Sequence, residues 1–264
     1  MLKRRILTGL FGGLFLLFFS YLGGIPWLLV VALIMLLGII EFFALSGQLR
    51  LVQKVTSITG VLLLACCSYR YGEELLWPAL LFIFLLGFLF LIVEFPRWSL
   101  TDLAITCLGI FYVGGLLSYL IILRQHLPNG WLFLWLTLFL TWAVDTGAFF
   151  TGKGWGRHYL CPQLSPGKTW EGALGGVVAG VLVAVAVSRY YPVLSIGQLL
   201  IMGLITALAG EVGDLVESAF KRQAGIKDSG NLLPGHGGIL DRFDSLFFIA
   251  PVIYYYLRWA ISLN

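Results

Sequence analysis

A long apolar run near the start of the chain decides the fold: Ile25-Pro-Trp-Leu-Leu-Val-Val-Ala-Leu-Ile-Met-Leu-Leu-Gly-Ile-Ile-Glu41-Phe-Phe-Ala-Leu-Ser46. A helix of about 20 residues crosses the hydrocarbon core of a bilayer, so this run is long enough to span it. Its residues do not alternate between apolar and polar, as they would in a strand of a membrane barrel. A helix also satisfies its backbone polar groups within the segment. The run therefore predicts a transmembrane helix.

Runs of the same kind recur along the whole chain. Of its 264 residues, 59% are hydrophobic and 11% are charged, whereas a soluble domain carries about 25% charged residues. Candidate spans cover residues 6–22, 25–46, 55–70, 77–96, 101–123, 131–151, 171–190, 196–217 and 244–262. We therefore expect an all-α fold, a polytopic transmembrane helical bundle of about nine spans. We expect one integral membrane domain over residues 1–264, with mostly scaffold helices in 1–130 and the catalytic helices and loops in 131–264.

The positions of Lys and Arg predict the orientation in the membrane. With the N-terminus in the cytoplasm, 13 of the 17 Lys and Arg residues fall in inner segments, as the positive-inside rule requires. This orientation puts the two most basic loops, 152–170 and 218–243, on the cytoplasmic side. The net charge of +4 is small, and no basic run has interleaved aromatic residues. Nucleic acid is therefore not expected as a partner.

A few acidic residues lie within the predicted spans. Glu41 and Glu94 stand near the cytoplasmic ends of theirs, and an interfacial side chain is the preferred interpretation of each, with a functional role as the alternative. Asp145 lies inside an apolar run, where an unpaired carboxylate is costly. It is either a functional group or a structural partner of a Lys or Arg in a nearby loop.

The segment around Lys168 is a candidate anion site. The order Gly167-Lys168-Thr169 is similar to a phosphate-binding P-loop, but that motif requires a glycine at the position of Pro162 and a preceding strand. We therefore reject it. Thr169 is a candidate N-cap of the following helix, whose free N–H groups and dipole attract anions. Lys168 beside that helix end either binds an anion or anchors the chain at the membrane surface.

Acidic residues also line the end of the eighth span and the start of the ninth. Glu211, Asp214 and Ser218 share one helical face, and Asp241 and Asp244 stand three apart. Carboxylates at this spacing suit Mg²⁺, which is held by one or two carboxylates together with substrate phosphates. We expect the two acidic helix edges to face each other across one metal site. The alternative is ion pairing with the neighbouring basic residues Lys221, Arg222 and Arg242.

The segment between these two spans reads as a loop for phosphates. Its Gly235-His236-Gly237-Gly238 lets the backbone approach a ligand closely, and successive N–H groups in such turns bind anions. His236 alone is a weak signal for substrate contact. The basic residues around it either neutralise phosphates or only set the topology: Lys221, Arg222, Lys227 and Arg242.

Three segments together resemble the signature of phosphatidate cytidylyltransferases (CDP-diacylglycerol synthases). The longest reads Ser218-x-Phe-Lys-Arg-x4-Lys227-Asp228-x-Gly230-x2-Leu-Pro234-x-His236-Gly-Gly-Ile-x-Asp241-Arg242-Phe-Asp244. The others are Asp145-x2-Ala148-x3-Gly152 and Ser165-Pro-x-Lys168-Thr-x-Glu171-Gly. The resemblance is specific over residues of about 140–245, and many charged positions in it are fixed.

The resemblance implies an enzyme in which phosphatidic acid attacks the α-phosphorus of CTP, giving CDP-diacylglycerol and pyrophosphate. It implies Mg²⁺ as cofactor, a second cation such as K⁺, and a multi-pass protein of the inner (plasma) membrane. The residues expected to be catalytic are Asp214, Asp241, Lys221, Arg222, His236 and Arg242. Those expected to contact the substrates are Asp145, Ser165, Lys168, Thr169, Glu171, Ser218, Lys227, Gly237 and Gly238. The expected metal ligands are Asp214 and Asp241, followed by Asp228 and Asp244.

Two further expectations concern partners and alternatives. The resemblance also implies a homodimer, and the glycine-rich span 171–190 is compatible with one. A cation-coupled transporter is an alternative, but it predicts polar residues along a path to the outer face. A CDP-alcohol phosphotransferase also uses membrane carboxylates and Mg²⁺, but its acidic motif has a different spacing.

Overall fold

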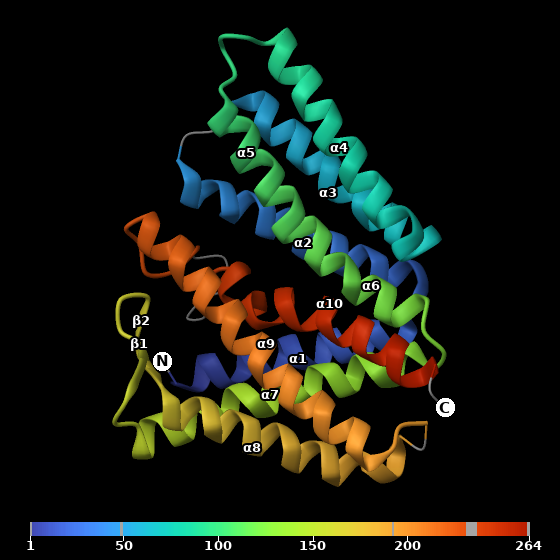
Figure 1. Ribbon diagram of the computed structural model, residues 1–264, viewed down its shortest axis with the longest axis vertical. Helices are drawn as coiled ribbons and strands as arrows, with labels where there is room; N and C mark the ends of the chain where they lie inside the picture. Colours follow the sequence, from blue (N-terminus) through green and yellow to red (C-terminus); the bar gives the residue numbers. More distant parts are fainter. Residues whose placement is uncertain (1, 48–49, 192, 231–236, 263–264) are drawn as a thin grey trace. The chain divides into compact units, whose positions relative to one another are not determined.

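The computed structural model describes residues 2–47, 50–191, 193–230 and 237–262. Almost all of them are helical (Figure 1). The helices, in chain order, are α1 (Leu2–Leu22), α2 (Gly24–Ser46), α3 (Leu51–Tyr71), α4 (Glu73–Val93), α5 (Leu100–Gly109), the π-helical turn η1 (Ile110–Gly115), α6 (Leu116–Gln125), α7 (Gly130–Trp155), α8 (Trp170–Val187), the 3₁₀ turn η2 (Ser188–Tyr190), α9 (Ile196–Gln223) and α10 (Leu240–Ser262). The prediction of an all-α transmembrane bundle is confirmed.

The helices match the predicted spans one for one. Within the described residues, 8 helical stretches are long and apolar enough to cross a membrane, and α1 adds the shorter apolar stretch Gly9–Leu22. Several boundaries differ from the prediction by three residues or more, and two of these bear on the polar stretch of residues 218–244. Helix α9 continues to Gln223 and α10 already begins at Leu240, so the polar stretch of residues 218–244 is helical at both ends. The connection between the two helices is correspondingly shorter.

The chain forms two compact units, which are described one at a time. Unit 1 contains Met1–Pro128 and Ile226–Arg242, and unit 2 contains Asn129–Gly225 and Phe243–Asn264. Most of the long signature motif therefore belongs to the same unit as the first six helices. The prediction of one integral membrane domain with a scaffold half and a catalytic half stays a prediction.

In unit 1, helix α3 packs against α2, α4, α6 and η1. Small residues allow the closest contacts, as is usual between helices in lipid. A Cβ added to Gly114 would lie 2.9 Å from Cδ1 of Leu64, so η1 and α3 approach without room for a side chain. The indole of Trp27 on α2 donates a hydrogen bond of 3.0 Å to the carbonyl of Leu120 on α6. The guanidinium of Arg124 bonds the last carbonyls of α1, at Ser20 and Tyr21.

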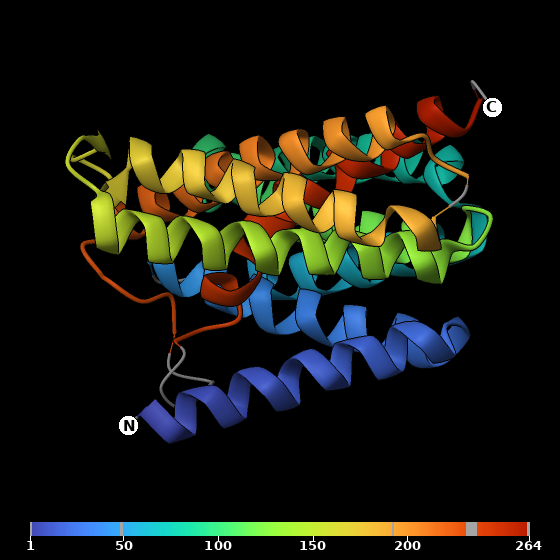
Figure 2. The same cartoon turned by 90° about the horizontal axis from the view of Figure 1, so that it is seen from below.

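In unit 2, helices α7, α8 and α9 lie side by side (Figure 1, Figure 2). A Cβ on Gly147 of α7 would lie 2.5 Å from that of Ala179 on α8. Another on Gly180 of α8 would lie 3.1 Å from the carbonyl oxygen of Gly203 on α9. The glycines of span 171–190 thus serve contacts within the unit, and they give no separate indication of the homodimer, which stays a prediction.

A small β-hairpin precedes α8 and was not expected from the sequence. Strand β1 (Tyr159–Cys161) pairs antiparallel with β2 (Ser165–Thr169), with Tyr159 opposite Thr169 and Cys161 opposite Ser165. Lys168 therefore lies on a strand, one residue before Thr169 ends it. Because both strands are short, the hairpin depends on the helices that flank it.

Candidate active site

The centre of the candidate site in unit 2 is the ammonium group of Lys168. Its Nζ lies 2.8 Å from Oδ2 of Asp214 and 2.9 Å from Oε1 of Glu211. Both acids stand on α9, three residues apart, and reach the same cation, as expected for one helical face. The Lys168 side chain is 21% exposed, and it points to the acids. The interpretation of Lys168 as a surface anchor is therefore wrong.

The two acids determine the charge of Lys168. Burial by itself would lower the pKa of this ammonium, but the carboxylates of Asp214 and Glu211 outweigh burial and raise the pKa above its ordinary value. Lys168 is thus protonated at neutral pH. It is a fixed positive charge beside the N-terminus of α8, whose first N–H groups also attract anions.

Helix α10 contributes a hydroxyl and a further carboxylate. Ser245 Oγ donates a hydrogen bond of 2.7 Å to Oδ1 of Asp214. The contact depends on Gly213, since a Cβ there would lie 2.5 Å from the carbonyl oxygen of Asp244. The Asp244 carboxylate interacts electrostatically with Asp214 and Asp145. The start of α10 and the end of α9 thus place two carboxylates and a hydroxyl together.

Asp145 on α7 belongs to the same cluster. Its carboxylate interacts with the hydroxyl of Ser245 and with the charges of Asp214, Lys168 and Glu211. The residue itself is exposed. The charge of Lys168 acts on Asp145, but the ion pairs of Lys168 in the described residues are with Glu211 and Asp214, so the interpretation of Asp145 as a structural partner stays a prediction. Asp145 is also a neighbour of every charged group in the cluster, so the functional interpretation stays open.

The carboxylates of this cluster are suitable ligands for a magnesium ion that also binds substrate phosphate. Within the described part of the chain, no three His, Cys, Asp or Glu side chains form a ready metal cage. Mg²⁺ does not require one, because it is commonly bound by one or two carboxylates, substrate phosphates and water. Asp214 and Asp244 supply hard oxygen ligands of this kind. The ion thus suits the donor set, and Mg²⁺ stays a prediction.

Thr169 and Glu171, from the motif that begins at Ser165, organise the start of α8. Thr169 Oγ1 accepts a hydrogen bond of 3.1 Å from the Gly172 N–H, so its prediction as N-cap is confirmed. Glu171 accepts bonds of 3.2 Å from the N–H groups of Arg157 and His158, and its Oε1 lies 2.6 Å from His158 Nδ1. Both residues fix the hairpin to the helix; their contact with substrate stays a prediction.

The other predicted residues of unit 2 lie along α9 and β2. Lys221 pairs with Glu217 at 2.5 Å, four residues earlier on the helix, which bears out part of the ion-pair alternative. Arg222 Nε donates to the Leu164 carbonyl at 3.0 Å and so connects α9 to the hairpin. Ser165 and Ser218 are half-buried.

In unit 1, Asp241 organises the signature segment, the part of the long motif within Ile226–Arg242, of which the structure describes residues 226–230 and 237–242. Its Oδ2 accepts hydrogen bonds from the Ser229 N–H at 2.9 Å, the Ser229 hydroxyl at 2.9 Å and the Gly238 N–H at 2.8 Å. Asp241 is 9% exposed. At Gly237, φ is +80°, and a Cβ there would lie 2.5 Å from Oδ2 of Asp241, so only glycine suits this position.

Glu41 of α2 contacts the same segment. Its Oε1 and Oε2 accept hydrogen bonds of 2.9 Å from the N–H groups of Ile239 and Leu240, and Oε2 accepts one of 3.2 Å from the Ser229 hydroxyl. Glu41 is 8% exposed. The interpretation of Glu41 as an interfacial side chain is therefore wrong.

The remaining predicted residues are divided between the units. Lys227, Asp228 and Arg242 are exposed in unit 1. His236 lies outside the described residues, so its role stays a prediction. Of the predicted metal ligands, Asp228 and Asp241 belong to unit 1, and Asp214 and Asp244 belong to unit 2. The prediction of one site built by all four stays untested.

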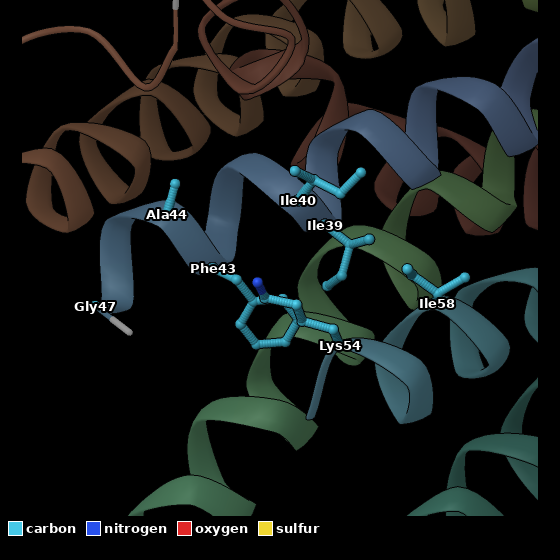
Figure 3. A pocket seen from close by; sticks show the side chains of 7 residues that line it. All are labelled: Ile39, Ile40, Phe43, Ala44, Gly47, Lys54 and Ile58. Atoms are coloured by element: carbon cyan, nitrogen blue, oxygen red, sulfur yellow. The ribbon is translucent and has the colours of Figure 1, made fainter. Parts of the chain in front are cut away.

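Unit 1 also contains a cavity of about 650 Å³, which is lined by other residues (Figure 3). Its lining comes from α2, the glycine that follows α2, and α3, and is apolar apart from one ammonium group: Ile39, Ile40, Phe43, Ala44, Gly47, Lys54 and Ile58. None of them is a predicted site residue. The cavity therefore does not carry the functional assignment, which depends on the polar clusters.

Comparison with known proteins identifies the family of the chain. The chain matches the model of the cytidylyltransferase family over residues 3–260. It is 33% identical to the phosphatidate cytidylyltransferase of Bacillus subtilis, covering 97% of either chain. It is 36% identical to the protein of that name from Staphylococcus saprophyticus, covering 92% of this chain and 89% of the relative. The chain belongs to the cytidylyltransferase family and is a multi-pass membrane nucleotidyltransferase.

Proposed function

We propose that this protein transfers the cytidylyl group of CTP to phosphatidic acid, producing CDP-diacylglycerol and pyrophosphate for phospholipid synthesis. One observation carries the proposal: the Lys168 ammonium, shared by Asp214 and Glu211, stands beside the N-terminus of α8 and close to Asp145. A fixed cation among carboxylates at the start of a helix is suited to bind a nucleoside triphosphate together with its metal ion. Relatives named phosphatidate cytidylyltransferase support the choice of acceptor.

The reaction does not require a covalent intermediate with the protein. A phosphate oxygen of phosphatidic acid attacks the α-phosphorus of CTP, the bond from that phosphorus to the bridging oxygen breaks, and pyrophosphate leaves. The attacking phosphate monoester is largely deprotonated at neutral pH, because its second pKa is about 6. No strong general base is then required. Positioning and charge neutralisation supply most of the rate in such transfers.

The residues of unit 2 divide these tasks. Lys168 exchanges one of its carboxylates for a phosphate oxygen of CTP, and Ser245 keeps Asp214 oriented through its 2.7 Å bond. Bound Mg²⁺, held by Asp214 and Asp244 together with phosphate oxygens, would neutralise charge that develops on the leaving pyrophosphate. Arg222 and Lys221 add positive charge along the last turns of α9. Asp241 and Asp228, which belong to unit 1, stay candidate ligands for Mg²⁺.

The side of the membrane follows from the positive-inside rule. We infer a cytoplasmic N-terminus and a site at the cytoplasmic face of the inner (plasma) membrane, where CTP is present and the lipid enters from the bilayer. The distribution of Lys and Arg supports this orientation. A homodimer and a second cation such as K⁺ complete the proposal.

Lys168→Ala is expected to weaken the use of CTP more than that of the lipid. The substitution removes the ammonium and leaves Asp214 and Glu211 to repel one another, so KM for CTP should rise about tenfold or more. Lys168→Arg, which keeps the charge, is the matched control and should lose less. Initial rates over a CTP series at fixed phosphatidic acid measure the effect. An unchanged CTP dependence in Lys168→Ala would remove Lys168 from the nucleotide site.

The function itself is tested with purified protein in detergent or vesicles. Labelled CTP is supplied with phosphatidic acid, with diacylglycerol, or with no lipid, each with and without Mg²⁺. We expect labelled CDP-diacylglycerol only with phosphatidic acid and Mg²⁺. Incubation of CDP-diacylglycerol with an alcohol acceptor tests the phosphotransferase alternative, and product there but not from CTP would refute the proposal.

A further inference from the structure

The carboxylate of Glu41 has no part in the predicted chemistry, yet it is buried and both of its oxygens accept hydrogen bonds. It stands near the end of α2, within a span of otherwise apolar residues. No ion pair involves it among the residues that the structure describes. A buried carboxylate without a cation is costly unless hydrogen-bond donors surround it. Its hydrogen-bond donors within the described part of the chain come from the signature segment, nearly 200 residues later in the sequence.

We propose that Glu41 is a positioning residue, which holds the described residues of the signature segment, 226–230 and 237–242, in their working conformation and fixes the residue at which α10 begins. The first N–H groups of a helix have no partner within the helix. Glu41 supplies acceptors for the N–H of Leu240, the first residue of α10, and for that of Ile239 just before it, each at 2.9 Å. It therefore caps α10 from another helix, in the way that an Asp or Glu at the N-cap does locally.

The Ser229 hydroxyl joins Glu41 to Asp241. It lies 3.2 Å from Oε2 of Glu41 and 2.9 Å from Oδ2 of Asp241. A hydroxyl has one proton to donate, so it bonds one carboxylate at a time and remains close to both. Through Ser229, the position of Asp241 depends on that of Glu41. Asp241 is a predicted metal ligand, so a shift of Glu41 is transmitted to the predicted chemistry.

Two glycines of the signature are required by Glu41. A Cβ on Gly230 would lie 2.7 Å from Oε1 of Glu41, and one on Gly238 would lie 2.4 Å from Oε2. Real side chains essentially never come so close, so the backbone reaches the carboxylate only because both residues lack one. These glycines thus form a cradle whose anion is a side chain of the protein itself.

Hydrogen exchange tests the positioning directly and without any substrate. In Glu41→Ala, peptides covering residues 237–245 should exchange about tenfold faster than in the unsubstituted protein, because two amide hydrogen bonds to a carboxylate are lost. Glu41→Gln keeps one acceptor oxygen and should show an intermediate effect. Glu94→Gln, an acid near the end of another span, is the matched control and should exchange normally. Unchanged exchange in Glu41→Ala would overturn the proposal.

Kinetics then separate positioning from a general loss of stability. This arm rests on the proposed function. In Glu41→Gln, kcat should fall about 10- to 100-fold, with KM for CTP and the thermal unfolding midpoint close to their normal values. Ser229→Ala, a milder change in the same network, should lower kcat less. If kcat stays normal while the exchange of residues 237–245 rises, the segment's conformation does not control catalysis, and the proposal fails. An inactive unsubstituted protein would instead refute the proposed function and leave the exchange result standing.

Discussion

Asp214→Asn is expected to lower kcat by about 10²- to 10³-fold, while the protein still inserts into the membrane. Asp214 stands between two donors, with Oδ2 at 2.8 Å from the Lys168 ammonium and Oδ1 at 2.7 Å from the Ser245 hydroxyl. Asparagine has one acceptor oxygen and no charge, so its amide nitrogen must face one of these donors. Loss of a preorganised charge at the reacting phosphates costs about this much in other enzymes. Initial rates of CDP-diacylglycerol formation, per amount of folded protein, measure it.

Two further variants accompany Asp214→Asn: one changes the orientation of the Asp214 carboxylate but not its charge, and the other is a control for the loss of an acid elsewhere. Ser245→Ala removes one hydrogen bond to the carboxylate and leaves its charge, so we expect a loss of about tenfold. Glu74→Gln neutralises an exposed acid in the first turn of α4 and should leave the rate unchanged. Near-normal turnover by Asp214→Asn would contradict the assignment of Asp214 to the metal and the nucleotide.

Asp241→Asn should also abolish most of the turnover, by about 10²-fold or more. The amide oxygen can still accept the bonds that Oδ2 receives from Ser229 and Gly238, so the segment is expected to keep its conformation. The negative charge needed for a cation is lost. Asp241→Ala removes the acceptor as well and leaves buried N–H groups unpaired, at about 1–3 kcal/mol each. It should therefore lose both activity and stability.

The comparison between the two Asp241 variants distinguishes a role of Asp241 as a metal ligand from a role in supporting the surrounding backbone. Activity and the Mg²⁺ concentration for half-maximal rate are measured for each, together with the unfolding midpoint. Asp102→Asn is a suitable control, since Asp102 also lies in the first turn of a helix of unit 1 and accepts bonds from Ser99 and Gln53. If Asp241→Asn has a normal rate and a normal Mg²⁺ requirement, its charge has no part in the reaction.

The helices were predictable because the bilayer fixes their length and solvent. Each span must be an apolar run of about 20 residues. Such a run can be recognised in the sequence without knowing which other helices pack against it. The ends were less predictable. Helix α9 continues for two polar turns past the apolar run, and the pair of Glu217 and Lys221 supports those turns. Helix α10 begins early because Glu41 satisfies its first N–H groups.

The charged cluster of unit 2 was predictable in part. The spacing of Glu211 and Asp214 indicated a common face, and both acids indeed bind one cation. That this cation is Lys168 was not predictable, because the contact joins α9 to a strand of a hairpin that no sequence pattern indicated. Ser245 was also missed, since a single serine after Asp244 has no distinctive signal.

The role of Glu41 could not be predicted from spacing or composition. Its partners are mostly backbone N–H groups, which every residue other than proline carries and no side-chain pattern reveals. Its one available signal was a lone acid in a span of otherwise apolar residues. Intramembrane acids are functional candidates by default, and that general expectation was the better guide than the interfacial interpretation.

Labelled CTP tests the central claim most directly. Purified protein is incubated with phosphatidic acid and Mg²⁺ and with CTP labelled either at the α- or at the γ-phosphorus, and lipid and aqueous products are separated. Attack at the α-phosphorus predicts that the α-label enters the lipid fraction and the γ-label appears in pyrophosphate, in equal amounts. A γ-label in the lipid, or no label in lipid from either CTP, would contradict the proposed cytidylyl transfer.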